Sequence, residues 1–231
     1  MSFSQPRIHP TAMIDPAAEI ADDLNIGPFA IVEGPVRLGP GCLVRARAHL
    51  IGPLTVGAGN DFGLNVVIGE RPQHLVLASA PGSVEIGANN VFRENVTVHR
   101  STQADVPTRI GDGNYFMAGS HLGHDCTVGN HCIFVNGSLI GGFVVVEDGV
   151  LLSGNSAVHQ NCRVGRLALL SAAATATKDV PPFAIQEGRN GLVGVNIIGM
   201  RRAGITNPQI HAVQQAYRIL LNSGLLLQAA V

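Results

Sequence analysis

The sequence contains no tryptophan, only two tyrosines and few charged residues. Charged residues make up 13% of the 231 residues, aromatic residues make up 4%, and the formal net charge is −1. A chain with so little charge has no basic surface of the kind that binds nucleic acid or an anionic membrane. It also has no apolar run near the roughly 18 residues that a membrane-spanning helix needs. We therefore predict neither a nucleic-acid partner nor integral membrane association.

Cysteine is also scarce. The four cysteines, Cys42, Cys126, Cys132 and Cys162, show no C-x-x-C spacing that would indicate a metal site or a redox pair. Each falls at a small-residue position of a six-residue repeat, so we expect buried free thiols that act as small apolar side chains. Residues 1–10 lack the apolar core of a secretory signal peptide, which favours a cytoplasmic protein. No metal and no other cofactor is predicted.

Large apolar residues recur at every sixth position from Ile8 to Ala176. Of the 29 positions in this series, 25 are Ile, Leu, Val or Phe, and only about 13 hydrophobic residues of any kind are expected by chance. The next residue is often glycine, as at Gly39 and Gly57, which suits a sharp corner. Two residues before each large apolar residue the side chain is usually small, as at Ala48. Each six therefore describes one short strand of a narrow prism.

Three such strands make a coil of about 18 residues, and the coils stack through backbone hydrogen bonds into a parallel β-helix. From about residue 8 to residue 180, the pattern resembles the hexapeptide-repeat family. That resemblance implies a left-handed helix, against the usual hand of parallel crossovers, and a homotrimer formed through the flat outer faces. The predicted fold class is therefore all-β: a left-handed parallel β-helix with a short C-terminal α-helical appendage.

The repeat is interrupted twice without loss of phase, by His74 and Ala80 and then by Ala104. An interruption that keeps the phase means that a whole number of sixes leaves the prism as a loop, and we expect such loops near residues 70–82 and 101–108. Loops of this kind often carry binding residues, although a tolerated insertion would look the same.

The β-helix is expected to end near the paired prolines Pro181 and Pro182, because proline cannot continue a ladder. Thr206-Asn207-Pro208 then predicts the start of a helix with one apolar face. A second short helix after Ser223 is also conceivable. The predicted divisions are a β-helix over residues 1–183 and a helical segment over residues 184–231.

The stretch from Ser120 to Gly129 holds the densest group of side chains able to move a proton. His121 and His124 flank an inward leucine, so both should project from the prism, where a histidine can act as a general base. Asp125 follows directly and can orient the ring of His124. The positions that an 18-residue coil places along one side are His121, His124, Gly142, His159 and Gln160.

Several motifs together resemble the UDP-N-acetylglucosamine 3-O-acyltransferase family. They are Val96–Arg100 (VTVHR), Gly123–Asn130 (GHDCTVGN), Ala157–Gln160 (AVHQ), Asp179–Pro182 (DVPP), and Gly194–Asn196 (GVN) with Arg201 and Arg202. Each motif alone is weak, but together they span nearly the whole chain. The resemblance implies an enzyme that opens lipid A synthesis by moving a 3-hydroxyacyl chain from acyl carrier protein to the 3-hydroxyl of UDP-N-acetylglucosamine.

The same resemblance implies a role for each matching residue. His124 would be the general base that deprotonates the sugar 3-hydroxyl, Asp125 would support it, and the N–H of Gly142 would stabilise the oxyanion. The hydroxyl would attack the thioester directly, without a covalent enzyme intermediate. The remaining implied contacts are Gln73, His99, His121, His159 and Gln160 to the sugar or acyl chain, Asn196 and Arg202 to the uridine diphosphate, and Ala172 as the gauge of acyl length.

The chain departs from the family pattern mainly at its substrate contacts. His74 and Val76 replace an acid and a lysine of the first loop, Phe143 replaces a histidine, Ile198 replaces an acid, and Ala203 replaces an arginine. The family also carries further helices after the position of Gly224, which help to bind acyl carrier protein. An acyltransferase acting on a different nucleotide sugar, such as a 3-amino sugar, or using acyl-coenzyme A, is therefore the main alternative.

Three other interpretations stay open. One is an acetyl-coenzyme A transferase of the same fold, and another is a non-catalytic scaffold. The third is a γ-type carbonic anhydrase, which holds zinc with three histidines. Its candidate ligands here are His99, His121, His124 and His131. The first and third of these leave the motifs near Asn196 and Arg202 without a role.

Overall fold

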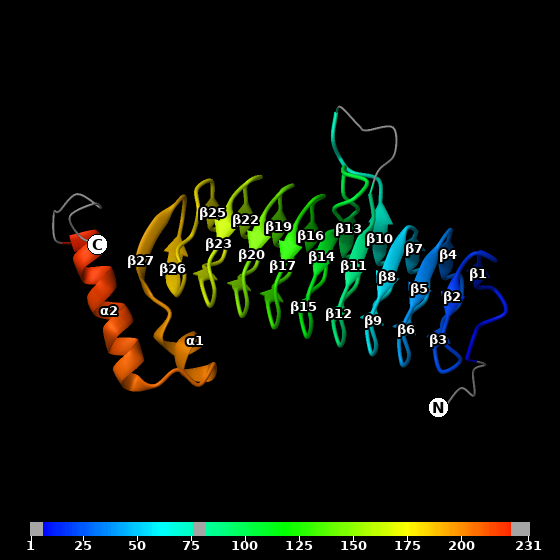
Figure 1. Cartoon of the computed structure of the whole chain (residues 1–231), viewed down its shortest axis with the longest axis horizontal. Coiled ribbons are helices and arrows are strands. Elements are labelled where there is room, and N and C mark those ends of the chain that lie inside the picture. Colours follow the sequence, from blue (N-terminus) through cyan, green and yellow to red (C-terminus); the bar gives the residue numbers. More distant parts are fainter. Residues whose placement is uncertain (1–6, 76–81, 223–231) are drawn as a thin grey trace.

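The computed structural model describes residues 7–75 and 82–222. In these ranges the chain winds into a prism whose three faces are β-sheets, and two helices follow at the C-terminal end (Figure 1). Neither helix is long and apolar enough to cross a membrane. Val76 and the second C-terminal helix suggested after Ser223 lie outside the described residues.

As far as β25, each sheet takes every third strand of the chain, as expected for a prism with three faces. The first sheet contains β1 (Met13–Ile14), β4 (Ile31–Glu33), β7 (His49–Ile51), β10 (Val67–Glu70), β13 (Thr97–His99), β16 (His121–Leu122), β19 (Leu139–Ile140), β22 (Ala157–Val158) and β25 (Thr175–Ala176). The second contains β2 (Glu19–Ile20), β5 (Val36–Leu38), β8 (Leu54–Val56), β11 (Val84–Ile86), β14 (Thr108–Ile110), β17 (Thr127–Val128), β20 (Val145–Val146) and β23 (Arg163–Val164). The third contains β3 (Asn25–Ile26), β6 (Leu43–Val44), β9 (Asp61–Phe62), β12 (Val91–Phe92), β15 (Tyr115–Phe116), β18 (Ile133–Phe134), β21 (Leu151–Leu152), β24 (Leu169–Leu170), β26 (Ala184–Glu187) and β27 (Gly191–Val195).

The strand register confirms a parallel β-helix built on six-residue repeats. Leu122 pairs with Ile140, and Ile140 pairs with Val158, so that partners lie one 18-residue coil apart. Two coils are longer, because Ile68 pairs with Val98 and Val98 pairs with Leu122, 30 and 24 residues apart. The extra residues are multiples of six, so the inward positions stay in phase on both sides of each interruption.

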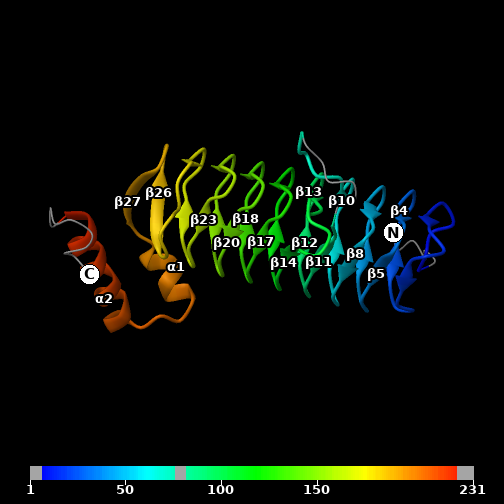
Figure 2. The same ribbon diagram turned by 45° about the horizontal axis from the view of Figure 1, so that its top comes forward.

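The extra residues lie between β10 and β11 and between β13 and β14, and the sequence predicts loops near residues 70–82 and 101–108. Residues 71–83 lie between β10 and β11, and their described parts, 71–75 and 82–83, are called the first loop. Residues 100–107 connect β13 to β14 and are called the second loop. Both views show the described parts of these loops leaving the prism at the same edge (Figures 1 and 2). The two loops therefore stand together beside the middle coils.

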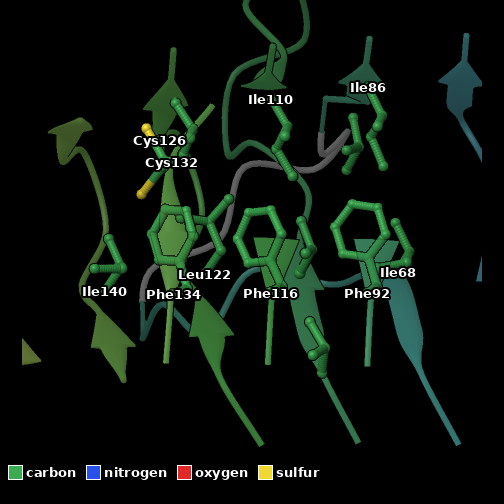
Figure 3. Close-up of a cluster of buried hydrophobic side chains, with 14 of the residues drawn as sticks. Ile68, Ile86, Phe92, Ile110, Phe116, Leu122, Cys126, Cys132, Phe134 and Ile140 are labelled. Carbon is green, nitrogen blue, oxygen red and sulfur yellow. The ribbon is translucent and has the colours of Figure 1, made fainter. Parts of the chain in front are cut away.

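The prism interior is filled by the large apolar residues of the repeat. Phe62, Phe92, Phe116 and Phe134 stack along the axis, with successive ring centroids 5.2, 4.9 and 4.3 Å apart. Figure 3 shows three of these rings in line, next to aliphatic residues from the other two sheets. All four cysteines are buried and unpaired, as predicted.

A buried column of asparagines at the small inward position is not evident from the repeat pattern. The side-chain amides of Asn90 and Asn114 each donate to the carbonyl oxygen of the preceding asparagine side chain, Asn60 and Asn90, at 2.9 and 3.0 Å. The backbone N–H of Cys132 then donates to Asn114 Oδ1 at 2.8 Å. Because each buried amide has partners in the adjacent coils, these polar groups are tolerated inside the prism.

The β-structure continues beyond residue 183, where we expected it to end. Pro181 and Pro182 precede a turn, after which β26 adds in parallel to β24, and β27 pairs antiparallel to β26. The prolines lie before the strand rather than within its ladder, so they do not block pairing. The segment after it contains α1 (Ile197–Arg202), which the sequence did not predict, and α2 (Asn207–Asn222), which starts as predicted.

The corner glycines are required by the close approach of successive coils. A Cβ at Gly57 would lie 2.7 Å from the carbonyl oxygen of Gly87 in the next coil. Both atoms belong to the backbone ladder, so neither can move alone. At Gly194 in β27, an added Cβ would meet nothing within 4 Å.

We predict that Gly57→Ala lowers the free energy of unfolding by about 1–3 kcal/mol, the usual cost of overpacking. Gly194→Ala is the matched control and should change stability by no more than about 0.5 kcal/mol. Urea unfolding of the two variants and the wild type, followed by circular dichroism, measures the difference. Equal stability of the two variants would show that close coil contact does not select glycine at the corner.

Candidate active site

A cavity of about 440 Å³ lies along the edge of the first sheet, at the corner that leads to the second sheet. It brings together seven side chains or backbone groups that the sequence singled out: Gln73, His99, His121, His124, Gly142, His159 and Gln160. The clustering predicted from the 18-residue coil is therefore found in the structure.

The backbone ladder positions this cluster. β13, β16, β19 and β22 are consecutive neighbours in the first sheet, and the chain turns a corner after each of the last three. At these corners Phe143 N donates to His124 O at 2.9 Å, and Asn161 N donates to Gly142 O at 3.0 Å. His124, Gly142 and Gln160 therefore occupy equivalent corner positions in three stacked coils. Gln73 reaches the same cavity from the first loop.

His124 and Asp125 form a close pair. The His124 Nδ1 atom lies 2.6 Å from Asp125 Oδ2, and the two side chains are 9% and 1% exposed. Burial alone would raise the pKa of Asp125, but hydrogen bonds from Ser101, His124 and Thr102 outweigh it and lower that pKa. An ionised Asp125 selects the His124 tautomer that carries its proton on Nδ1, which leaves Nε2 as the proton acceptor.

Gly142 lies directly against the His124 ring. A Cβ at Gly142 would be 2.6 Å from Cε1 and 2.8 Å from Nε2 of His124. Among the described residues, the Gly142 N–H donates no backbone hydrogen bond, whereas those of Gly141 and Phe143 do. A free N–H next to a proton acceptor is the arrangement that stabilises a developing oxyanion.

Two of the residues that depart from the family pattern flank the His124 ring. The rings of His74 and Phe143 both meet it edge to face, with centroids 5.4 and 5.2 Å away. Phe143 also adopts a positive φ of 61°, an uncommon conformation for a bulky residue. These substitutions therefore change the immediate surroundings of His124 and leave its contact with Asp125 in place.

His99 and His121 form a second pair, with ring centroids 5.1 Å apart. Burial, together with nearby His99 and His124, lowers the pKa of His121 to about 4, and burial also lowers the pKa of His99. Both rings are therefore neutral at neutral pH. His121 Nδ1 lies 2.8 Å from the Thr97 hydroxyl, whereas the buried His99 Nδ1 has no hydrogen-bond partner among the described residues. His99 thus presents an unsatisfied polar atom beside the cavity.

Three predicted site residues lie elsewhere. Asn196 and Arg202 line a separate cavity of about 940 Å³ over the third sheet, together with Ile198 and Ala203. The Asn196 side chain donates to Leu167 O and accepts from Gly199 N, so it caps α1. Ala172 is exposed at the turn between β24 and β25 and lines neither cavity.

The sequence did not identify the residues that surround Asp125. Ser101, Thr102 and Gln103 of the second loop all donate hydrogen bonds to its carboxylate. The interruption of the six-residue repeat indicated a loop near residues 101–108. Nothing in the repeat showed which residue that loop would contact.

Within the described part of one chain, the histidines do not assemble a metal site. In residues 7–75 and 82–222, no group of three or more His, Cys, Asp or Glu side chains is placed to hold a metal ion. His131, one of the candidate zinc ligands, lines the cavity over the third sheet rather than the histidine cavity.

Family models match two parts of the chain. A model described as domain 2 of UDP N-acetylglucosamine O-acyltransferase matches residues 179–231, and one for bacterial transferase hexapeptides matches residues 107–142. The acyl-[acyl-carrier-protein]–UDP-N-acetylglucosamine O-acyltransferase of Anaeromyxobacter sp. (strain Fw109-5) is 44% identical over 97% of this chain and 88% of its own. The protein of the same name from Stenotrophomonas maltophilia (strain R551-3) is 41% identical over 100% of this chain and 89% of its own.

Solved structures agree. The UDP-N-acetylglucosamine acyltransferase of Bacteroides fragilis 9343 superposes with a TM-score of 0.93 at 37% identity, over 96% of this chain and 88% of its own. The Francisella novicida enzyme also gives a TM-score of 0.93, at 32% identity over 96% of this chain and 83% of its own. With relatives this similar along nearly its whole length, the chain belongs to the acyl-[acyl-carrier-protein]–UDP-N-acetylglucosamine O-acyltransferase family.

Proposed function

We propose that this enzyme transfers a 3-hydroxyacyl group from acyl carrier protein to the 3-hydroxyl of UDP-N-acetylglucosamine, with His124 as the general base. The observation that carries the proposal is the contact between His124 Nδ1 and Asp125 at 2.6 Å, beside a cavity that also contains the Gly142 backbone. This pair leaves His124 Nε2 free to accept a proton at the place where Gly142 can hold an oxyanion.

The reaction uses one base and one oxyanion donor. His124 Nε2 takes the proton of the sugar 3-hydroxyl as its oxygen attacks the thioester carbonyl carbon. The Gly142 N–H donates to the resulting oxyanion, and Asp125 stabilises the imidazolium. Collapse of the tetrahedral intermediate breaks the carbon–sulfur bond, and the imidazolium returns its proton to the departing thiolate. The products are the sugar ester and the free carrier thiol.

The neutral histidines suit a sugar ligand. His99 and His121 can each donate one hydrogen bond and accept another, which matches the hydroxyl groups of a hexosamine. Gln73, His159 and Gln160 line the same cavity and add further donors and acceptors. These groups offer the hydroxyls of a sugar several hydrogen-bond partners in one cavity.

The outer faces of the prism support the expected homotrimer. The second sheet is charged on the outside, with ion pairs such as Arg37–Glu19 and Arg109–Glu85 at 3.0 Å. The outward residues of the other two sheets are mostly apolar: Met13, Ile31, Val67, Leu139 and Ala157 on the first, and Leu43, Val91, Tyr115, Ile133, Leu151 and Leu169 on the third. Two apolar faces suit a closed ring of three, in which the first sheet of one copy packs against the third sheet of the next.

Such a ring also explains why Arg202 is remote from His124 within one chain. The histidine cavity opens along the first sheet, and the larger cavity with Arg202 opens over the third sheet. Packing of these sheets would place a sugar beside His124 of one copy and its diphosphate beside Arg202 of the next. Arginine suits a phosphate because its planar group donates two parallel hydrogen bonds.

A second candidate acceptor is a nucleotide sugar with an amine at C3. His74 and Phe143 contact the His124 ring where the family pattern has an acid and a histidine. An acceptor with a different group at the reacting carbon would explain changes at this place. The same base and the same oxyanion donor would serve both acceptors.

We predict that His124→Ala lowers kcat by at least about 10²–10⁴-fold, the usual contribution of a general base. The assay incubates the enzyme with 3-hydroxyacyl carrier proteins of several chain lengths and either the 3-hydroxy or the 3-amino nucleotide sugar, with products identified by mass spectrometry. His211→Ala, an exposed histidine on α2, is the control and should keep full activity. If the wild-type enzyme acylated neither of the two sugars, the proposed function would be contradicted.

We predict that Val91→Arg, on the third sheet, converts the trimer into monomers, because the new charge would be buried at the interface. Thr127→Arg adds the same charge to the outer face of the second sheet and should leave the trimer intact. Sedimentation velocity distinguishes the species by mass. A trimer that survives Val91→Arg and dissociates with Thr127→Arg would mean that different faces pair.

We predict that His124→Ala and Arg202→Ala, each of low activity alone, regain activity when co-expressed. In a mixed ring, an interface can combine His124 from one copy with Arg202 from the next, and random assembly leaves about a quarter of the sites intact. Differently tagged copies allow hybrids to be purified and assayed. Hybrids no more active than either parent would place both residues in a site made by one chain.

A further inference from the structure

We propose that Ser101 and Thr102 of the second loop are positioning residues that hold the Asp125 carboxylate against His124. The role is assigned by contact geometry, and it rests on the proposed function of His124 as the base. The two residues would act through Asp125 and would not touch the substrate.

The contacts surround both carboxylate oxygens. The Ser101 hydroxyl lies 2.5 Å from Oδ1, and the Thr102 hydroxyl lies 2.9 Å from Oδ2. The Thr102 N–H lies 3.1 and 3.2 Å from the two oxygens, and the Gln103 side-chain amide donates to Oδ1 at 3.3 Å. With His124 Nδ1 on Oδ2 at 2.6 Å, the carboxylate is held from several directions.

The backbone of Asp125 is held by the end of the same loop. The Asp125 N–H donates to the Thr108 hydroxyl at 2.8 Å, where β14 begins. Asp125 itself has a φ of 60°, a conformation that an L-residue adopts at some cost unless its surroundings hold it. Both ends of the residue are thus fixed by one segment of the chain.

The second loop is in turn braced by the end of the first. The Gly82 N–H donates to Ser101 O at 2.8 Å, and the Thr108 N–H donates to Ser83 O at 3.0 Å. A Cβ at Gly82 would lie 1.9 Å from Gln103 O, so the two segments are in direct backbone contact. The first loop also supplies Gln73 to the cavity, which makes the two loops one supporting unit.

Polar donors compensate the buried charge of Asp125. Its side chain is 1% exposed, and no Lys or Arg pairs with it among the described residues. The titratable groups nearby are His124, the neutral His99 and His121, His74 against the His124 ring, and the buried Cys126 thiol. Without the hydroxyl donors, a buried carboxylate loses much of its stabilisation and is free to rotate away from His124.

The test compares Thr102→Val, which keeps the side-chain shape and removes the hydroxyl, with Thr102→Ser, which keeps the hydroxyl. Thr102→Val should lower kcat about tenfold or more and leave KM within about twofold, because the hydroxyl bonds a charged group that acts in the transition state. Thr102→Ser should retain most of the wild-type kcat. Asp105→Asn, an exposed change in the same loop, controls for general disturbance.

A double-mutant cycle separates positioning from loop packing. In an Asp125→Ala background, Thr102→Val should cause no further fall in kcat, since the hydroxyl then has nothing to position. An additional tenfold fall in that background would overturn the proposal, as would a Thr102→Val enzyme with wild-type kcat.

A second readout needs no substrate and therefore distinguishes failure of this proposal from failure of the proposed function. With ¹⁵N-labelled histidine, the His124 Nδ1–H resonance is assigned by its loss in His124→Ala. It should persist in Thr102→Ser and disappear or shift upfield in Thr102→Val. An unchanged resonance in Thr102→Val would overturn the positioning role, even if no acceptor sugar were turned over by the wild type.

Discussion

Backbone hydrogen bonds between successive coils hold every other feature of the structure in place. Each strand is only two to five residues long, so no strand is stable alone, and the register of its neighbours decides where its side chains point. Because the coil length is a multiple of six, equivalent residues of successive coils lie above one another. The aromatic stack inside the prism and the line of His124, Gly142 and Gln160 on its corner are two results of the same ladder.

The interruptions add chemistry without disturbing this ladder. An insertion that shifted the strand pattern by one residue would turn the following inward residues outward and expose the core. Multiples of six avoid that cost, and the inserted residues can then adopt conformations that the repeat forbids. Gln73 and the donors to Asp125 come from these loops, whereas His124 and Gly142, the proposed base and oxyanion donor, come from the repeat itself. The site therefore combines regular backbone positions with a local irregular support.

The parts predictable from the sequence are those that follow the repeat. The period of six indicated the prism and its core, and coil arithmetic placed His124, Gly142 and Gln160 together. Contacts between irregular segments could not be predicted, because they depend on the path that each segment takes outside the repeat, and no periodic pattern specifies that path. The donors from Ser101 and Thr102, the cap made by Asn196, and the strands after Pro182 are of this kind. The asparagine column follows the lattice, but its hydrogen bonds depend on side-chain rotamers that a periodic pattern does not specify.

The contacts that hold His124 in place are separate from the contacts made by the residues that depart from the family pattern. Asp125 and the second loop act on Nδ1, and Gly142 lies beside Nε2 and Cε1. The departures from the family pattern, His74 and Phe143, both meet the His124 ring edge to face. Substitution at those two positions can therefore reshape the space beside the ring while the contact between His124 and Asp125 stays in place. The groups of the proposed reaction, His124, Asp125 and Gly142, are held by different contacts, namely the backbone ladder and the hydrogen bonds from the second loop.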